Sequence, residues 1–185
     1  MVTNRDAVTA AFPAVADIGD EALAKQVVET WTRALAETAW DLDEIPWFPP
    51  VQDELGLPDE RLVDHVNDVV AAADALAATL ADRRGARVDR DVVLAGALVH
   101  DVSKLYEFSP AGPTPVFDLL GHPYYGVFAT ASAGLPVEVV HVVLSHTHRT
   151  NVEPVTLEAA VVRRADEVAA AAIRAQATTE PGRPK

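Results

Sequence analysis

Apolar residues recur along most of this chain at intervals of three and four positions, the spacing that lines one face of an α-helix. Leu23, Val27 and Trp31, for example, form such a stripe within residues 20–40. No segment shows the sustained alternation of apolar and polar residues that is typical of a half-buried β-strand. We therefore predict an all-α fold, a helical bundle.

Capping residues and prolines set the expected limits of the helices. Asp59 and Asp89 each precede a helical pattern and are predicted to cap it, and Gly85 ends the first of these two patterns. Proline interrupts 41–58 and 108–121, so we expect neither stretch to form one continuous helix. The predicted helices cover residues 20–40, 59–85, 89–106, 122–134, 136–147 and 156–176.

Three regions are expected along the chain. Residues 1–58 supply an N-terminal helix and a proline-rich connection packed on the domain, 59–177 form one helical domain, and 178–185 form a disordered tail. Because the first helix, with Trp31 and Trp40, could pack on the domain or on a second subunit, a homo-oligomer is left open.

Composition narrows the chemistry. The 185 residues include no cysteine, which excludes thiolate metal sites and a cysteine nucleophile, so any metal must be bound through nitrogen and oxygen. The formal net charge of −13 disfavours duplex nucleic acid and anionic membranes, whereas a small anionic substrate is compatible with a metal site. The chain lacks a signal-peptide pattern and a membrane-spanning apolar run, and a cytoplasmic location is expected.

Several side chains that bind metals stand where the predicted helices should be apolar, and one more opens a helix. Burying an imidazole or a carboxylate is costly unless the group is paired or bound to a metal. Such residues in several helices therefore indicate a metal centre inside the bundle. The candidate ligands are His65, His100, Asp101, His122, His146 and Asp166.

Most of these candidates also have a purely structural interpretation. His65 could be a core histidine bonded to a backbone carbonyl. Asp101 could pair with Lys104, and Asp166 with Arg163.

The places of three histidines in the predicted helices suggest other roles for them. His122 could simply cap a helix, and His141 is expected at the surface or the core boundary. His148 falls where a helix is ending and is expected to support a ligand or to contact the substrate.

The order of the candidates resembles the HD superfamily of metal-dependent phosphohydrolases. His65, the HDxxK form at His100-Asp101 and Lys104, and Asp166 in RRADEV follow one another along about residues 59–173. The resemblance implies an HD-domain helical bundle that hydrolyses phosphoric esters with divalent metal ions. Iron, manganese, zinc, cobalt, nickel and magnesium all suit nitrogen and oxygen ligands.

His122 in GHPYYG and His146 in SHTHRT look like the extra histidines of the dinuclear branch of that superfamily. This branch includes HD-GYP cyclic-dinucleotide phosphodiesterases and diadenosine-tetraphosphate hydrolases of HD type, so two metal ions are expected. No GYP signature follows His146, which argues against cyclic di-GMP, and the ED pair of the (p)ppGpp hydrolases is missing after His100-Asp101.

The resemblance also implies roles. Asp101 would bridge two metals and Lys104 would contact phosphate or the metal-bound water, which makes these two the expected catalytic residues. Lys104 is thereby also a substrate-binding residue, and His148 and Arg149, just past the end of a predicted helix, are expected from that position to bind a second anionic group of the substrate. His65, His100 and Asp166 would hold one metal, and His122 and His146 the other. The expected reaction is hydrolysis of a small phosphoester or nucleotide by a metal-bridged hydroxide.

Two other functions stay open. A mixed-valent diiron oxygenase of the same superfamily would use the same ligands but needs redox-active iron and O2, with Trp47, Phe48, Tyr124 and Tyr125 around an apolar pocket. In a non-enzymatic role, the metal would only fix a helical scaffold for a partner. Residues 40–57 and 108–120 are expected to form the pocket walls.

Overall fold

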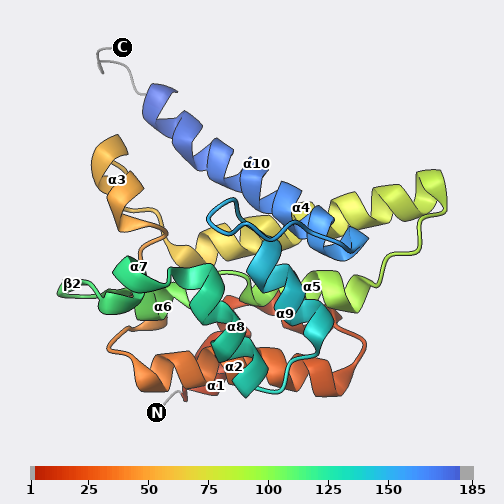
Figure 1. Ribbon diagram of the computed structural model, residues 1–185, viewed down its shortest axis with the longest axis horizontal. Helices are drawn as coiled ribbons and strands as arrows, with labels where there is room; N and C mark the ends of the chain where they lie inside the picture. Colours follow the sequence, from red (N-terminus) through yellow and green to blue (C-terminus); the bar gives the residue numbers. More distant parts are fainter. Residues whose placement is uncertain (1–2, 180–185) are drawn as a thin grey trace.

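A computed structural model describes residues 3–179 and places them in a bundle of helices (Figure 1). The N-terminal part comprises α1 (Asn4–Ala11), the 3-10 helix η1 (Pro13–Asp17), α2 (Glu21–Glu37), the 3-10 helix η2 (Leu42–Glu44) and α3 (Pro49–Leu55). The helices that follow are α4 (Leu62–Arg84), α5 (Arg90–Val99), α6 (Lys104–Glu107), α7 (Pro115–Leu119), α8 (His122–Ser132), α9 (Val137–Ser145) and α10 (Leu157–Thr179). The all-α prediction is confirmed, and a short hairpin of β1 (Phe108–Ser109) and β2 (Gly112–Pro113) is added to it.

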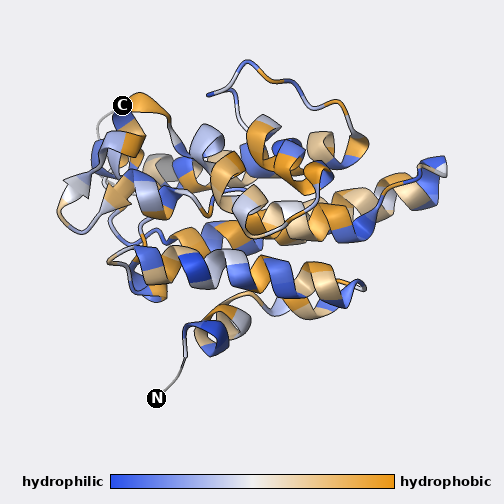
Figure 2. Ribbon diagram, turned by 60° about the horizontal axis from the view of Figure 1, so that its bottom comes forward, coloured by the Kyte–Doolittle hydropathy of each residue, from blue (hydrophilic) through white to orange (hydrophobic). Residues whose placement is uncertain are grey.

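The apolar helix α5 is the centre of the bundle. Every residue of it from Val93 to Val99 is buried, and α2, α4, α9 and α10 pack around it (Figure 1). Gly96 permits the close approach of α9, because a Cβ atom at this position would lie 2.7 Å from Cγ1 of Val142. Apolar residues recur along the inward faces of the surrounding helices (Figure 2).

The N-terminal segment completes this core. Asp20 caps α2 by accepting hydrogen bonds from the backbone N–H groups of Ala22 and Leu23. Trp31, on the predicted apolar stripe, is fully buried and donates its indole N–H to the carbonyl of Leu98 at 2.8 Å. In this chain Trp31 therefore packs on α5.

Two predicted boundaries are confirmed and two are wrong. Asp89 caps α5, and Gly85 ends α4 in the left-handed conformation. Asp59 does not cap α4, which begins at Leu62 after Arg61, where the backbone pairs with the segment at Pro46. The helix predicted over 89–106 is also interrupted: α5 ends at Val99, residues 100–103 form a turn, and α6 follows.

The proline-rich stretches contain more structure than predicted. α3 and α7 each have proline at the start, a position where the missing N–H costs no hydrogen bond. The stretch 108–121, expected to be a loop, holds the hairpin and α7. At the C-terminus, α10 continues through Thr179, past the predicted start of the tail, and the rest of that tail lies outside the described residues.

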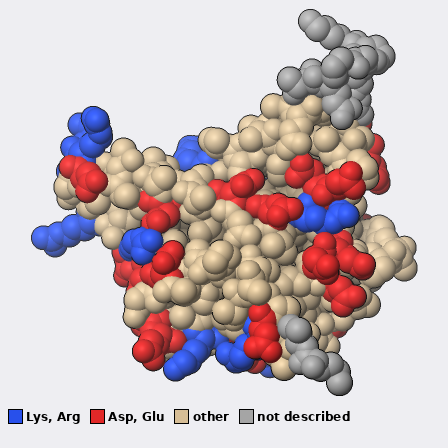
Figure 3. All heavy atoms as spheres, turned by 180° about the vertical axis from the view of Figure 1, so that it is seen from behind, with Lys and Arg blue, Asp and Glu red and all other residues tan. Residues whose placement is uncertain are grey.

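On the face of the molecule shown in Figure 3, acidic side chains outweigh basic ones, in keeping with the net charge of −13. Within the described part of the chain, none of the helices combines the length and the apolar character needed to cross a bilayer.

Candidate metal centre

The turn after α5 lies where four other helices meet, and the candidate ligands converge there. His65 comes from α4, His122 from the first residue of α8, His146 from the end of α9 and Asp166 from α10. The ligand atoms form two groups, each within 4.8 Å. One group is His65, His100 and Asp166, and the other is Asp101, His122 and His146.

Asp101 lies between the two groups. Its Oδ1 atom is 3.3 Å from Nε2 of His122 and 3.5 Å from Nε2 of His146, and its Oδ2 atom is 3.3 Å from Nε2 of His100. Nε2 of His65 is 3.1 Å from Oδ1 of Asp166. One carboxylate thus faces imidazoles of both groups, which is the arrangement a bridging ligand needs.

Buried polar atoms without partners show that this set fits divalent cations. Nε2 of His65, Nε2 of His100 and Oδ1 of Asp101 find no hydrogen-bond partner among residues 3–179. Each such atom costs about 1–3 kcal/mol when it is left unpaired in a protein interior. Nitrogen and oxygen lone pairs that face one another across a few ångströms are the donor set that divalent metals take.

Hydrogen bonds on the far side of two rings fix the direction of their free nitrogens. Nδ1 of His100 is 2.7 Å from the carbonyl of Ala97, and Nδ1 of His146 is 2.7 Å from the carbonyl of Val143. Both carbonyls belong to the last turn of a helix, where no further backbone N–H is available. Each Nδ1–H therefore donates to a carbonyl, which leaves the Nε2 lone pair directed at the site.

Glu107 does the same for His122 and was missed in the sequence. This carboxylate is fully buried, and it accepts from the backbone N–H of His122 at 2.6 Å and lies 3.0 Å from its Nδ1. Arg149 adds an ion pair to Glu107 at 3.5 Å. The sequence around Glu107 does not distinguish a buried glutamate from an exposed one, so it gave no reason to expect this role.

The surroundings keep the acids ionised and His122 neutral. Burial alone would raise the pKa of Asp101, but Lys104 and His100 hold it well below 3.8. Burial opposes ionisation of Asp166 too, yet the neighbouring imidazole of His65 lowers the pKa of this carboxyl to about 2. Burial lowers the pKa of His122 to about 4. At neutral pH these groups are in the protonation states that bind metal.

Of the two ion pairs considered as alternatives to metal binding, the structure contains that of Asp101 with Lys104 and not that of Asp166 with Arg163. Lys104 is buried and does pair with Asp101, at 2.6 Å, in addition to the histidines around that carboxylate. Arg163 pairs with Glu153 and Glu167 at 2.9 and 3.4 Å, so its charge is directed away from the metal-ligand face of α10.

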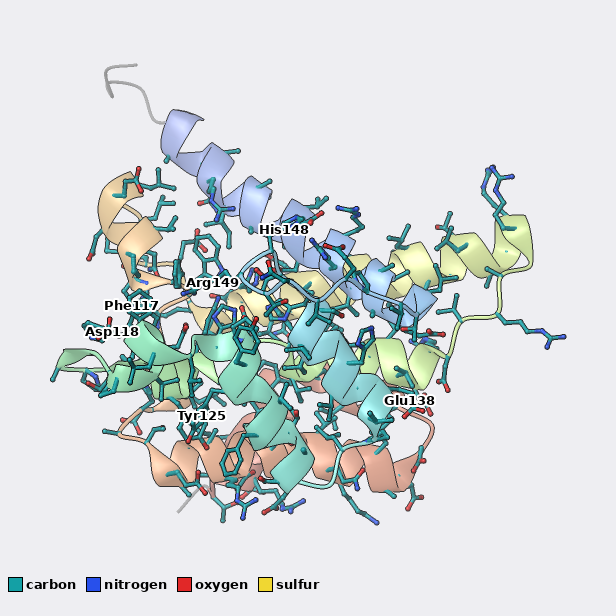
Figure 4. The ribbon with its side chains drawn as sticks, viewed as in Figure 1. Phe117, Asp118, Tyr125, Glu138, His148 and Arg149 are labelled. Atoms are coloured by element: carbon teal, nitrogen blue, oxygen red, sulfur yellow. The ribbon has the colours of Figure 1, made fainter. Side chains whose placement is uncertain are left out.

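The two predicted substrate contacts after α9 lie in different places. His148 is 72% exposed at the side chain and bonds to Glu167 of α10, whereas Arg149 lies on the side of α7, near Phe117 (Figure 4). His141 is half-buried and accepts from the backbone N–H of Val155 at 3.0 Å.

A cavity of about 110 Å³ opens onto the ligand set. Lys104 and Arg149 line it, together with Trp47 and Phe48 and with Arg174 of α10, which was not predicted. A larger cavity of about 540 Å³, lined by parts of both predicted wall segments, lies beyond Phe48 and includes none of the candidate ligands in its lining.

Comparison with known proteins identifies the class. The family model described as "HD domain" matches residues 62–171, which is more than half of the chain, so the chain belongs to the HD domain family. Among characterised proteins it is similar to the dihydroneopterin 2',3'-cyclic phosphate phosphodiesterase of Methanocaldococcus jannaschii, with 28% identity over 165 residues. That match covers 81% of this chain and 64% of the relative, so the chain spans less than two thirds of the relative's length. No solved structure matches the chain.

Proposed function

We propose that this chain is a metal-dependent phosphohydrolase that acts on a small organic phosphoester. The observation that carries the proposal is the pair of three-residue ligand groups with Asp101 between them, opening onto a cavity that three cationic side chains line. Anionic phosphoryl oxygens match both the cations and a divalent metal. Membership in the HD domain family supports the same activity.

We further propose that the site holds two divalent metals, one in each ligand group. Manganese or iron suits the mixture of imidazole and carboxylate ligands, and zinc, cobalt, nickel and magnesium remain in the series to be tested. When bound, such metals supply Lewis acidity that polarises the phosphoryl group and acidifies water.

The protein residues position the substrate and balance charge. The ammonium group of Lys104 is buried, 2.6 Å from Oδ2 of Asp101, and lines the cavity, so it can donate to a phosphoryl oxygen as negative charge develops there. Glu107 and the rings of Phe48 and Phe117 hold the guanidinium of Arg149, which can donate two parallel hydrogen bonds to a phosphate.

The printed name of the relative suggests which esters to test first. That protein is a phosphodiesterase of a 2',3'-cyclic phosphate carried by dihydroneopterin. We propose that this chain accepts phosphate esters of comparably small organic groups, cyclic diesters included. His148 remains a predicted substrate contact and is given no part in this proposal.

A phosphatase screen tests the proposed function. Protein loaded with Mn²⁺ or Fe²⁺ is assayed, in the presence and absence of O2, against nucleotides, phosphomonoesters and cyclic phosphodiesters. We expect anaerobic hydrolysis that Asp101→Asn abolishes with circular dichroism unchanged, and that Asp68→Asn, an exposed aspartate of α4, leaves intact. Substrate turnover that consumes O2 and requires iron would instead establish the oxygenase alternative.

A further inference from the structure

Two adjacent rings organise a row of cations at the mouth of the metal cavity. The Lys104 ammonium lies 5.7 Å from the centre of the Trp47 ring and 5.5 Å from that of Phe48. Arg149 lies 5.3 Å from the centre of Phe48, and Arg174 lies 5.5 Å from the centre of Trp47. All five side chains line the same cavity. Cation–π contacts at these distances hold the guanidinium groups in place before a ligand binds.

Only one cation of the row is without an acidic partner within the described part of the chain. Lys104 pairs with Asp101, and Arg149 pairs with Glu107. Arg174 makes no ion pair with any residue of 3–179, although the protein carries 28 acidic residues against 15 Lys and Arg. A cation that rests on a ring at a cavity mouth, with its charge uncompensated, is prepared to receive an anion.

Helix geometry places Arg174 beyond the reacting centre. Asp166, Ala170 and Arg174 are four residues apart on one face of α10, and all three line the cavity. Eight residues of helix separate the first from the last, a rise of about 12 Å between their Cα atoms. Arg174 is exposed and lies at the mouth of the cavity, whereas Asp166 lies beside His65 at the metal centre.

The cavity is too small to hold a whole substrate, so different parts of the substrate must lie in the cavity and at its mouth. About 110 Å³ is the space of about four water molecules, which suits a phosphoryl group beside the metals but not a whole organic substrate. The rest of the bound substrate must therefore extend out through the mouth of the cavity. There it meets Arg174, while His148, outside the lining of this cavity, is engaged by Glu167.

We propose that Arg174 binds a second anionic group of the substrate, so that the preferred substrate is an organic phosphoester that also carries a phosphate or a carboxylate. This inference rests on the proposed function of the site. Trp47 acts as the platform that holds the guanidinium ready. A charged hydrogen-bonded contact of this kind is worth about a tenfold to hundredfold change in affinity.

Non-hydrolysable phosphonates test the proposal by isothermal titration calorimetry on Mn²⁺-loaded protein. The three ligands are propylphosphonate, its carboxylate-tailed analogue phosphonobutyrate, and the bisphosphonate propylenediphosphonate. We expect at least one two-anion ligand to bind more tightly than propylphosphonate, and Arg174→Gln to reduce that advantage by about tenfold. If Arg174→Gln loses the tighter binding of phosphonobutyrate, the second group is a carboxylate. If it loses the tighter binding of propylenediphosphonate, the second group is a phosphate.

The control variant is Arg83→Gln, which removes one positive charge from the exposed end of α4 and should preserve the advantage. The proposal is overturned if wild-type protein binds all three ligands equally, or if Arg174→Gln weakens all three to the same degree. Because phosphonates are not hydrolysed, these results are independent of turnover. Intact discrimination without hydrolysis of any ester would contradict the proposed function alone.

Discussion

Replacing Glu107 by Gln should weaken one metal site and leave the other unchanged. Glu107 is fully buried, and its two carboxylate oxygens face two N–H groups of one residue, the backbone N–H and Nδ1–H of His122. Glutamine has the same shape but only one acceptor oxygen. Whichever way the amide turns, its NH2 group faces one of those two donors. Either a hydrogen bond is lost or His122 adopts the tautomer whose Nε2 carries the proton.

The size of the effect follows from that exchange. Loss of a partner that orients a metal-binding histidine costs about 10- to 100-fold in metal affinity, or about 1.4 to 2.8 kcal/mol. The loss should be confined to the group of Asp101, His122 and His146, because Glu107 contacts His122 of that group. Among the described residues, Glu107 has no hydrogen bond or ion pair with a member of the other group.

Calorimetric titration of the apo protein with Mn²⁺ measures both sites. We expect two binding events in the wild type and, in Glu107→Gln, one event that is weaker by about 10- to 100-fold beside one that is unchanged. Glu138→Gln, an exposed acid on α9 (Figure 4), makes the same change of charge and should alter neither event. Equal weakening of both events, or of neither, would refute the orienting role of Glu107.

Three further expectations concern turnover, pH and metal removal. Lys104→Gln should lower kcat by about 10²- to 10³-fold with metal content unchanged, as steady-state kinetics and elemental analysis would show, and a change below about threefold would contradict its role. Asp74→Asn should cost about 0.5–1 kcal/mol in urea unfolding near neutral pH, since Arg90 lowers the pKa of Asp74 below 3.8 and the pair is part-exposed. The stability due to this depressed pKa is present above 3.8 and is lost as the pH falls below it, so the difference between the two proteins should shrink on acidification, and an undiminished difference in acid would argue against the pair. Chelation should lower Tm by about 5–10 °C if metal is otherwise present at about 100 times its Kd, whereas an unchanged Tm would count against a metal held by the folded state.

Most of the candidate ligands could be found in the sequence because they stand where a helix should be apolar, whereas His122 opens a helix. A histidine such as His65, set among Leu62, Val66 and Val69, has no reason to be buried unless something binds it. The interruption of the helix at His100 left no such trace, because neither glycine nor proline stands there. Adjacent residues of a continuous helix point about 100° apart. In the structure both His100 and Asp101 reach the metal centre from the turn that follows α5.

The spacing of residues along the chain could not predict the residues that act by positioning others. Glu107 is defined by its contact with His122, fifteen residues away, and no spacing rule connects the two. Arg174 did leave a signal, since it shares a helical stripe with Asp166, but an arginine near the end of a helix usually stabilises that end. The helices α3 and α7 were missed because the prolines of these two stretches were taken as helix breakers and not as first residues.

The central claim is that the converging histidines and aspartates hold divalent metals in two adjacent positions. Anomalous X-ray diffraction from crystals of the Mn²⁺-saturated protein, measured at the manganese edge, tests it directly. We expect two peaks, one among His65, His100 and Asp166 and the other beside His122 and His146, with Asp101 between them. Manganese bound elsewhere on the acidic surface, with no peak at these residues, would contradict it.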